Sequence, residues 1–197
     1  MAKAPFWSTQ NTDPKRKFRW VVRFTNADQE ILQLAAKNVK KPNYEIGSTA
    51  HKWLNHTFYF PARLEWKEIS LSLVDIGGTK DVTTIIDAIT KAAGYRSPTD
   101  VEACKVAITK QKSVQAFGNM FEIIQLDGDG QDVEKWTLIN PWVKMVDFGE
   151  LSYDSDDLVE LALTIQYDYA EKDASIRSST ADAIGTLARN IISGGGL

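Results

Sequence analysis

Few residues of this chain have the types and spacing that metal binding requires. The 2 histidines, His51 and His56, lie five positions apart, and an odd spacing on one strand places two side chains on opposite faces. We therefore do not expect them to bind one metal ion together. The run DGDGQD begins at Asp127 like a calcium loop, but its sixth position is Asp132 instead of glycine, and its twelfth is Leu138 instead of glutamate. We interpret this run as the turn of a β-hairpin.

Nucleophiles and phosphate-binding loops are equally sparse. The single cysteine, Cys104, falls on the apolar stripe of a predicted helix, which is typical of a buried, unreactive thiol. No G-x-S-x-G elbow and no G-x-G-x-x-G loop occurs. A carboxylate pair among Asp154, Asp156 and Asp157 stays open as an enzyme hypothesis, although such a cluster is typical of a solvated loop. We expect no catalytic residue, no cofactor and no bound metal.

Charge is unevenly distributed along the chain. Residues 122–173 hold 14 acidic residues and 3 lysines, whereas the remainder holds 12 acidic and 20 basic residues. Such asymmetry indicates charged partners or an acidic solvated face. The basic run KRKFRW at 15–20 is too short to predict specific nucleic-acid binding. No segment reaches 18 consecutive apolar residues and the N-terminus lacks an apolar signal core, so we expect neither a membrane helix nor a secretory signal.

The elements that must position any site are mainly strands. Period-2 alternation predicts strands at 17–25, 31–39 and 64–74, and around the DGDG turn. A phase change near Lys67–Glu68 indicates a bulge, or a strand that crosses between two packing environments. Helical spacing and capping residues predict helices at 81–94 and 97–110. The fold class is therefore mostly β or α+β, with a helical insert at about 81–111.

The chain divides into three parts. We expect an N-terminal arm at 1–16, one domain at 17–173, and a C-terminal tail at 174–197 that is either a short helix or disordered. Within the domain, LVELALTIQYDY at 158–169 alternates over twelve residues. That is about twice the usual strand length. Its more polar face contains four residues of interest: Glu160, Thr164, Gln166 and Asp168.

Taken in order, several segments resemble the tail tube proteins of contractile-tailed bacteriophages. They are KFRWVVRF, KKPNYEI, LNHTFYFPARLEWKEISLSLVD and EKWTLINPWVKMVDFGELSYDSDDLVELALTIQYDYAE. The resemblance covers about residues 15–173 and does not extend to the tail. It implies two packed antiparallel sheets, in a β-sandwich or barrel, with a helix alongside. The tube proteins of pyocins and type VI secretion share this architecture.

The resemblance also implies a structural function without enzyme activity. Six subunits would form a ring, and stacked rings would form the inner tail tube of a virion, assembled in the host cytoplasm. The implied partners are further copies of the chain, the tail sheath, baseplate tube-initiator and tail terminator proteins, a tape-measure protein in the lumen, and passing DNA bound without sequence specificity. A baseplate tube-initiator of the same fold is an alternative function. A monomeric small-molecule-binding β-barrel is a further alternative, from a different class.

Two groups of residues follow as site hypotheses. We expect Glu160, Thr164, Gln166 and Asp168 to face the lumen, where acidic groups would keep DNA from sticking. We expect the aromatic residues Trp53, Phe58, Phe60 and Trp66 to contact an adjacent subunit. Ring formation is expected to use backbone pairing along the strands at 64–74 and 158–169, because neither has an interior proline.

Overall fold

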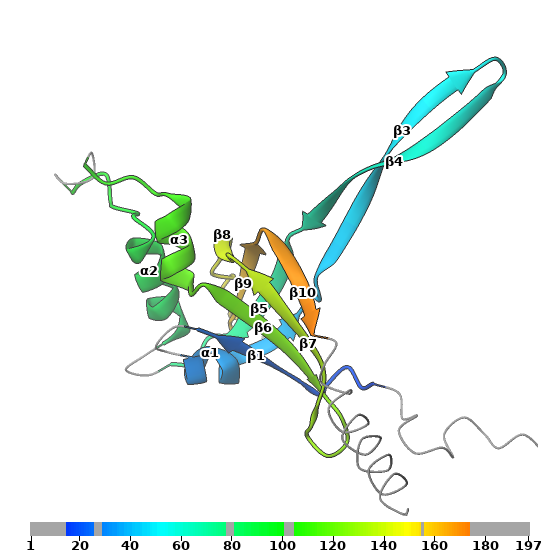
Figure 1. Cartoon of the computed structure of the whole chain (residues 1–197). Helices are drawn as coiled ribbons and strands as arrows, with labels where there is room; N and C mark the ends of the chain where they lie inside the picture. Colours follow the sequence, from blue (N-terminus) through cyan, green and yellow to red (C-terminus); the bar gives the residue numbers. More distant parts are fainter. Residues whose placement is uncertain (1–14, 26–28, 78–80, 101–104, 155, 174–197) are drawn as a thin grey trace, which may run out of the picture.

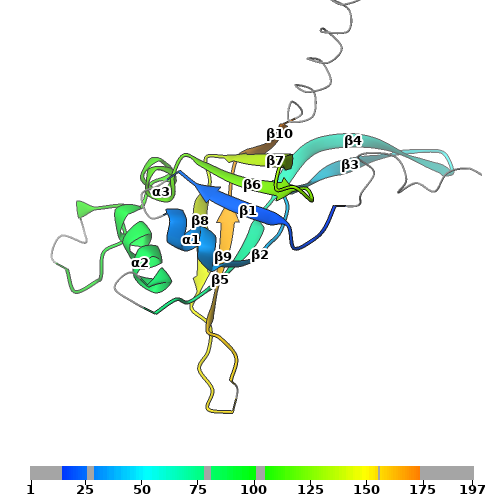
Figure 2. The ribbon, with the colours of Figure 1, turned by 90° about the horizontal axis from the view of Figure 1, so that it is seen from below.

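The computed structural model describes residues 15–25, 29–77, 81–100, 105–154 and 156–173 (Figure 1). Within these residues, two four-stranded antiparallel sheets pack together, and a two-stranded hairpin projects from them (Figures 1 and 2). The first sheet has the order β1 (Trp20–Phe24), β6 (Met120–Leu126), β7 (Asp132–Ile139), β10 (Tyr169–Asp173). The second has the order β2 (Ala36–Val39), β5 (Ile69–Val74), β9 (Glu160–Gln166), β8 (Trp142–Asp147). The predicted fold class is therefore confirmed.

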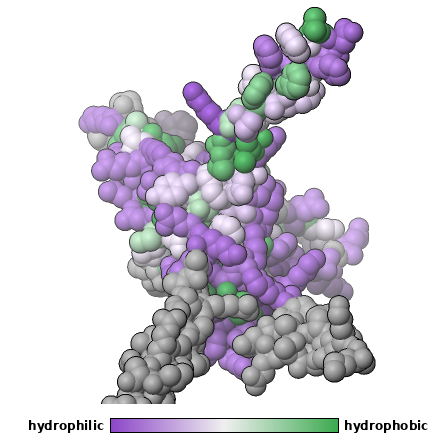
Figure 3. All heavy atoms as spheres, turned by 45° about the vertical axis from the view of Figure 1, so that its right-hand side comes forward, coloured by the Kyte–Doolittle hydropathy of each residue, from purple (hydrophilic) through white to green (hydrophobic). Residues whose placement is uncertain are grey.

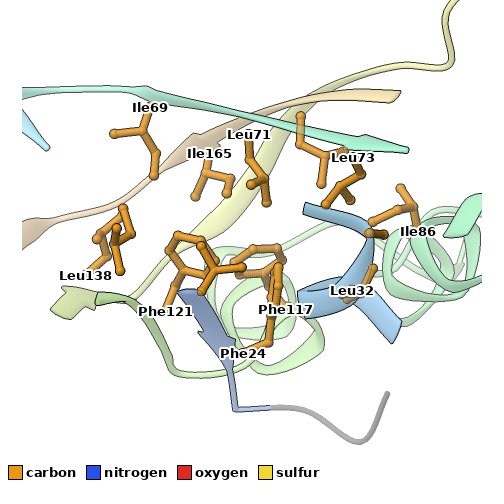
Figure 4. Packing of buried hydrophobic residues seen from close by; sticks show 14 of the residues in the cluster. Phe24, Leu32, Ile69, Leu71, Leu73, Ile86, Phe117, Phe121, Leu138 and Ile165 are labelled. Atoms are coloured by element: carbon orange, nitrogen blue, oxygen red, sulfur yellow. The ribbon is translucent and has the colours of Figure 1, made fainter. Parts of the chain in front are cut away.

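The core lies between the two sheets and follows the alternation of their strands. On β5 and β9 every second residue is buried, and each of these leucines and isoleucines is at most 1% exposed. They face Phe121 and Leu138 of the first sheet across the interior (Figure 4). The rings of Phe24 and Phe121 meet edge to face at 5.0 Å, a favoured aromatic geometry. Apolar side chains thus fill the space between the sheets.

The helical insert packs against one end of the sandwich. Helix α2 (Val82–Ala92) begins as predicted, because Asp81 Oδ1 accepts a hydrogen bond from the backbone N–H of Thr84 at 3.1 Å. The predicted second helix at 97–110 is wrong in its described part, since 105–109 precede helix α3 (Lys110–Phe117). Thr109 caps α3 through Lys112 N–H, which sets its start. Cys104 lies outside the described residues.

Three expected strands are corrected. Residues 29–35 form helix α1 (Gln29–Ala35), not a strand, because good helix formers place Leu32 and Ala35 on one buried face. The expected strand 64–74 is divided at Glu68 between β4 (His56–Lys67) of the hairpin and β5 of the second sheet, at the predicted phase change. The expected strand 158–169 is divided after β9, and β10 belongs to the first sheet.

The arm at 1–14 and the tail at 174–197 lie outside the described residues, so the predicted domain boundaries stay predictions. Among the helices of the described part of the chain, none is long and apolar enough to cross a membrane.

A buried carboxylate ties the segment before the hairpin to the first sheet. Burial raises the pKa of Glu134 on β7, but hydrogen bonds from Lys15, Trp136 and Lys41 outweigh burial and leave the pKa at about 2. Lys41 Nζ donates to Glu134 at 2.9 Å and to Gln125 at 2.6 Å. The Trp136 indole donates to the same carboxylate at 2.6 Å. Because Lys41 lies two residues before the start of β3 (Asn43–Trp53), this cluster fixes the position from which the hairpin starts.

We predict that Glu134→Gln removes much of the acid sensitivity of the fold. The folded-state pKa of about 2 lies below the ordinary value of 4.5, so the stability that ionised Glu134 contributes is present above pH 4.5 and is lost as the pH falls towards 2. In that window the wild type should lose about 3 kcal/mol more unfolding free energy than the variant, as measured by denaturant titration. The exposed control Glu150→Gln should retain the wild-type pH dependence; a Glu134→Gln profile that also retains it contradicts the assignment.

Candidate assembly surfaces

The hairpin of β3 and β4 is the most exposed element of the described chain. Its strands have 11 and 12 residues and pair from Asn43–Lys67 to Trp53–His56, with one irregularity between Ile46 and Ser48. It projects away from the sandwich, on the side opposite helices α2 and α3 (Figure 1). An isolated two-stranded hairpin is marginally stable in water. Its length therefore indicates that it is stabilised by a contact outside the described residues.

One face of the outer half of the hairpin is aromatic. The register places Trp53, Phe58 and Phe60 on the same side, and they are 62%, 50% and 57% exposed. His51 lies on this face with its ring 6.5 Å from that of Phe60. Tyr59 points to the opposite face and is 71% exposed. Figure 3 shows apolar side chains gathered on the hairpin and at its root.

The hairpin turn corrects the expectation about the histidines. The chain reverses at Leu54 and Asn55, so His51 and His56 lie on different strands and share a face. The odd-spacing argument was wrong because it assumed one continuous strand. No group of three or more metal-ligating side chains occurs among the described residues. Leu54 itself has φ of 52° and is 84% exposed, which places an apolar side chain at the tip in a strained backbone conformation.

Trp66 lies at the hairpin root and has a different environment. Its ring packs between Tyr44 of β3, at 5.2 Å, and Tyr167, at 6.0 Å, and it is partly buried against the core. Burial raises the pKa of Tyr167 to about 12. Trp66 therefore joins the hairpin to the sandwich within one chain, whereas the other three predicted contact residues face outwards.

On the two central strands, β5 and β9, the outer face of the second sheet carries mostly small, neutral side chains. Ser70 of β5 pairs with Thr164 of β9, and Ser72 pairs with Ala162. Gln166 continues this face at one end, and Glu160 continues it at the other, where it forms an ion pair with Lys37 of β2. Three of the four residues predicted to face a lumen thus lie on one sheet face.

Asp168 is separated from that face. It follows the end of β9, at the corner where the chain crosses to the first sheet. Lys110 Nζ donates to Asp168 at 2.6 Å and Asn140 Nδ2 donates at 2.9 Å, and these contacts lower the pKa of Asp168. Asp168 therefore connects α3 to the corner. The prediction that it faces a lumen assumed one continuous strand from 158 to 169, and that strand ends before Asp168.

The free sheet edges differ from the expected ones. β5 and β9 are central strands with hydrogen-bonded neighbours on both sides, so they are not available for pairing with another copy. The edges are β2 and β8 in the second sheet, and β1 and β10 in the first. We expected the long alternating strands to lie at sheet edges. A central strand with one buried face gives the same alternation of apolar and polar residues, so the pattern does not distinguish the two positions.

Similar folds occur in chains of contractile injection systems. A chain of the anti-feeding prophage baseplate is 12% identical over 82% of this chain and 96% of that one, with a TM-score of 0.59. A chain of the PVC sheath/tube terminator is 12% identical over 82% and 98%, with a TM-score of 0.58. A chain of the PVC sheath-tube complex is 13% identical over 82% and 92%, with a TM-score of 0.55.

No protein-family model matches the chain, and no curated protein matches it in sequence. The likeness to the three solved structures therefore concerns the fold. At that level the resemblance to tube proteins is confirmed.

We predict that Asp168→Lys lowers the stability of the isolated subunit. The substitution removes two hydrogen bonds and places a lysine beside Lys110. Since the ion pair is partly exposed, the loss of unfolding free energy should be about 1 kcal/mol. Thr164→Lys should change the unfolding free energy by less, because the cross-strand partners of Thr164 are the neutral residues Ser70 and Met145. Equal stabilities of the two variants in denaturant titration contradict the corner role of Asp168.

Proposed function

We propose that this chain is a tube subunit of a contractile tail, and that it assembles into stacked hexameric rings through which a genome passes. The observation that carries the proposal is the projecting hairpin, whose aromatic face has no cover within the described chain. The fold shared with contractile injection system chains supports the same role. Trp53, Phe58 and Phe60 would contact the adjacent ring, with Trp66 holding the hairpin at its root.

The lumen is formed by the outer face of the second sheet in this proposal. That face presents hydroxyl, amide and methyl groups, and its acid Glu160 is ion-paired with Lys37. The outer face of the first sheet is instead charged, with Lys135 bonded to Glu122 at 2.7 Å. Cationic groups gain affinity for DNA by releasing counterions. A face lined by Thr164 and Gln166, with Asp168 at its end and Lys37 held by Glu160, would let DNA pass.

The partners follow from this role. Copies of the chain form the rings, a sheath surrounds the tube, and terminator and initiator proteins close its two ends, while a tape-measure protein occupies the lumen before DNA. The solved structures of similar fold come from sheath-tube, terminator and baseplate assemblies, which supports these contexts. The site of action is then the virion tail, after assembly in the host cytoplasm.

A baseplate tube-initiator is the second candidate function, and the likeness to a baseplate chain favours it. Electron microscopy of the purified protein separates the two: a tube subunit elongates into tubes of many rings, whereas an initiator forms single rings. A small-molecule-binding barrel fits less well, because apolar side chains fill the interior between the sheets. A carboxylate enzyme among the loop acids has no supporting geometry in the described residues.

We predict that Trp53→Ala weakens ring stacking more than it destabilises the subunit. The side chain is 62% exposed, so its loss should cost the isolated subunit less than about 0.5 kcal/mol. A buried aromatic anchor contributes about 2 kcal/mol or more at an interface, so the critical concentration for tube growth should rise at least about 30-fold.

The matched control is Tyr59→Ala, which removes an equally exposed aromatic ring from the opposite hairpin face. Light scattering measures tube growth and thermal melting measures the subunit. Equal effects of the two variants on growth would contradict a contact through the aromatic face.

We predict that Thr164→Lys leaves tubes intact and slows DNA passage. Six new cations per ring would attract phosphate, with an affinity that falls as salt rises. Thr164 is a better probe than Glu160 or Asp168, because both acids already pair with lysines inside the subunit.

Thr137→Lys is the control, since Thr137 lies on the outer face of the first sheet opposite Glu171. Ejection assays on tailed particles at two salt concentrations measure the effect. Normal ejection by Thr164→Lys particles, or slow ejection by the control alone, would show that the second sheet does not line the lumen.

A further inference from the structure

An apolar groove runs beside helix α1 and strand β1, at one side of the sandwich. It has a volume of about 740 Å³, and its lining includes Phe18, Trp20, Val21, Leu34 and Lys37. Phe18 is 76% exposed and Leu34 is 81% exposed, so the described chain leaves these side chains in solvent. Large apolar side chains gathered in a groove indicate a docking site.

The loop between β8 and β9, described at 148–154 and 156–158, carries matching chemistry. Its apolar members are strongly exposed: Phe148 50%, Leu151 86%, Tyr153 110% and Leu158 70%. It projects beyond the end of the second sheet (Figure 2). Its acids Glu150, Asp154 and Asp156 carry the charge opposite to that of Lys17, which adjoins Phe18 of the groove in the sequence. Apolar and charge complementarity therefore favour the loop as the occupant.

Both ends of the loop are anchored to the second sheet. Gly149 has φ of 76°, and a Cβ at this position would lie 2.5 Å from the carbonyl oxygen of Glu160. The other end is fixed by the N–H of Asp75, which donates to the carbonyl oxygen of Val159 at 2.9 Å. The loop therefore leaves the sheet in a defined direction, as a protruding contact requires.

Sheet topology places the start of the loop and one side of the groove at the same level, on opposite edges of the second sheet. β8 and β2 are the two edges of the second sheet. At one end of the second sheet, Val74 of β5 pairs with Glu160 of β9. The last residue of β8, Asp147, pairs with Ala162 near this end. The first residue of β2, Ala36, pairs with Leu73 and also lies near it. When the β8 edge of one copy adjoins the β2 edge of the next, the loop of the first meets the groove of the second.

We propose that the loop 148–158 of each subunit inserts into the groove of the neighbouring subunit in a ring, with Tyr153 as the central anchor. This inference rests on the proposed ring-forming function and names the lateral contact that function needs. The contact is heterologous, since each copy offers its loop to one neighbour and its groove to the other, and such contacts generate a ring when the rotation between copies closes. Tyrosine is enriched among the side chains that dominate interface energies.

The test combines two variants that each block one side of the contact. Tyr153→Asp destroys the loop anchor and Leu34→Asp destroys the groove, and both residues are exposed enough to spare the fold. Each variant alone should form hexamers at least about tenfold less readily than the wild type in native mass spectrometry. Mixed together, the intact loop of Leu34→Asp can enter the intact groove of Tyr153→Asp. The mixture should therefore contain 1:1 dimers that do not extend.

The control is Ile108→Asp, a 61% exposed residue near the helical insert that belongs to neither surface and should leave ring formation unchanged. If wild-type rings form and both variants form them equally well, or if the mixture gives no dimers, the loop–groove contact is overturned while the ring stands. If the wild type forms no rings at any concentration, with or without a nucleating partner complex, the proposed function fails and the contact fails with it.

Discussion

The hairpin of β3 and β4 has two strands only and cannot bury either of its faces against itself. The contacts that hold it to the rest of the described chain lie at its root. Lys41, just before β3, is bonded to the buried carboxylate of Glu134, and Trp66, at the end of β4, packs between Tyr44 and Tyr167. One contact is ionic and the other aromatic, and they hold both strands at their base. Because the root is fixed and the tip is not, the hairpin is preorganised for a contact that it does not make within the chain.

The same root is where the two sheets exchange strands. The chain leaves the hairpin for the second sheet at Glu68, and leaves the second sheet for the first at Tyr167–Asp168. The aromatic side chains of Trp66 and Tyr167 pack together and join these two corners. Lys110 and Asn140 secure the second corner through Asp168. The hairpin, both sheets and the insert therefore meet in one region, and its side chains set how the outward surfaces are oriented.

Alternation in the sequence predicted which residues face the core, but not where strands end or change sheet. Leu161, Leu163 and Ile165 are buried as expected, yet the same pattern continues through Tyr167, where the chain turns a corner. Because the residue at this corner is also buried, the alternation of apolar and polar residues continues through it. The sequence pattern therefore does not show where the strand ends. The hairpin reversal at Leu54 and Asn55 was also hidden, because that turn lacks the glycine that usually marks one. Trp53, which we expected from the sequence at a contact with another subunit, is 62% exposed in the single chain.

The charge asymmetry of the sequence has in part an internal explanation. Acids of the 122–173 segment pair with lysines from the remainder: Glu134 with Lys15 and Lys41, Glu160 with Lys37, and Asp168 with Lys110. Part of the imbalance that suggested charged partners is therefore neutralised within the fold. Glu150, Asp154 and Asp156 differ, since they have no ion-pair partner in the described part of the chain and stand beside exposed Leu151 and Tyr153. These three acids lie on an anchored loop, and their negative charge is available to a neighbouring molecule.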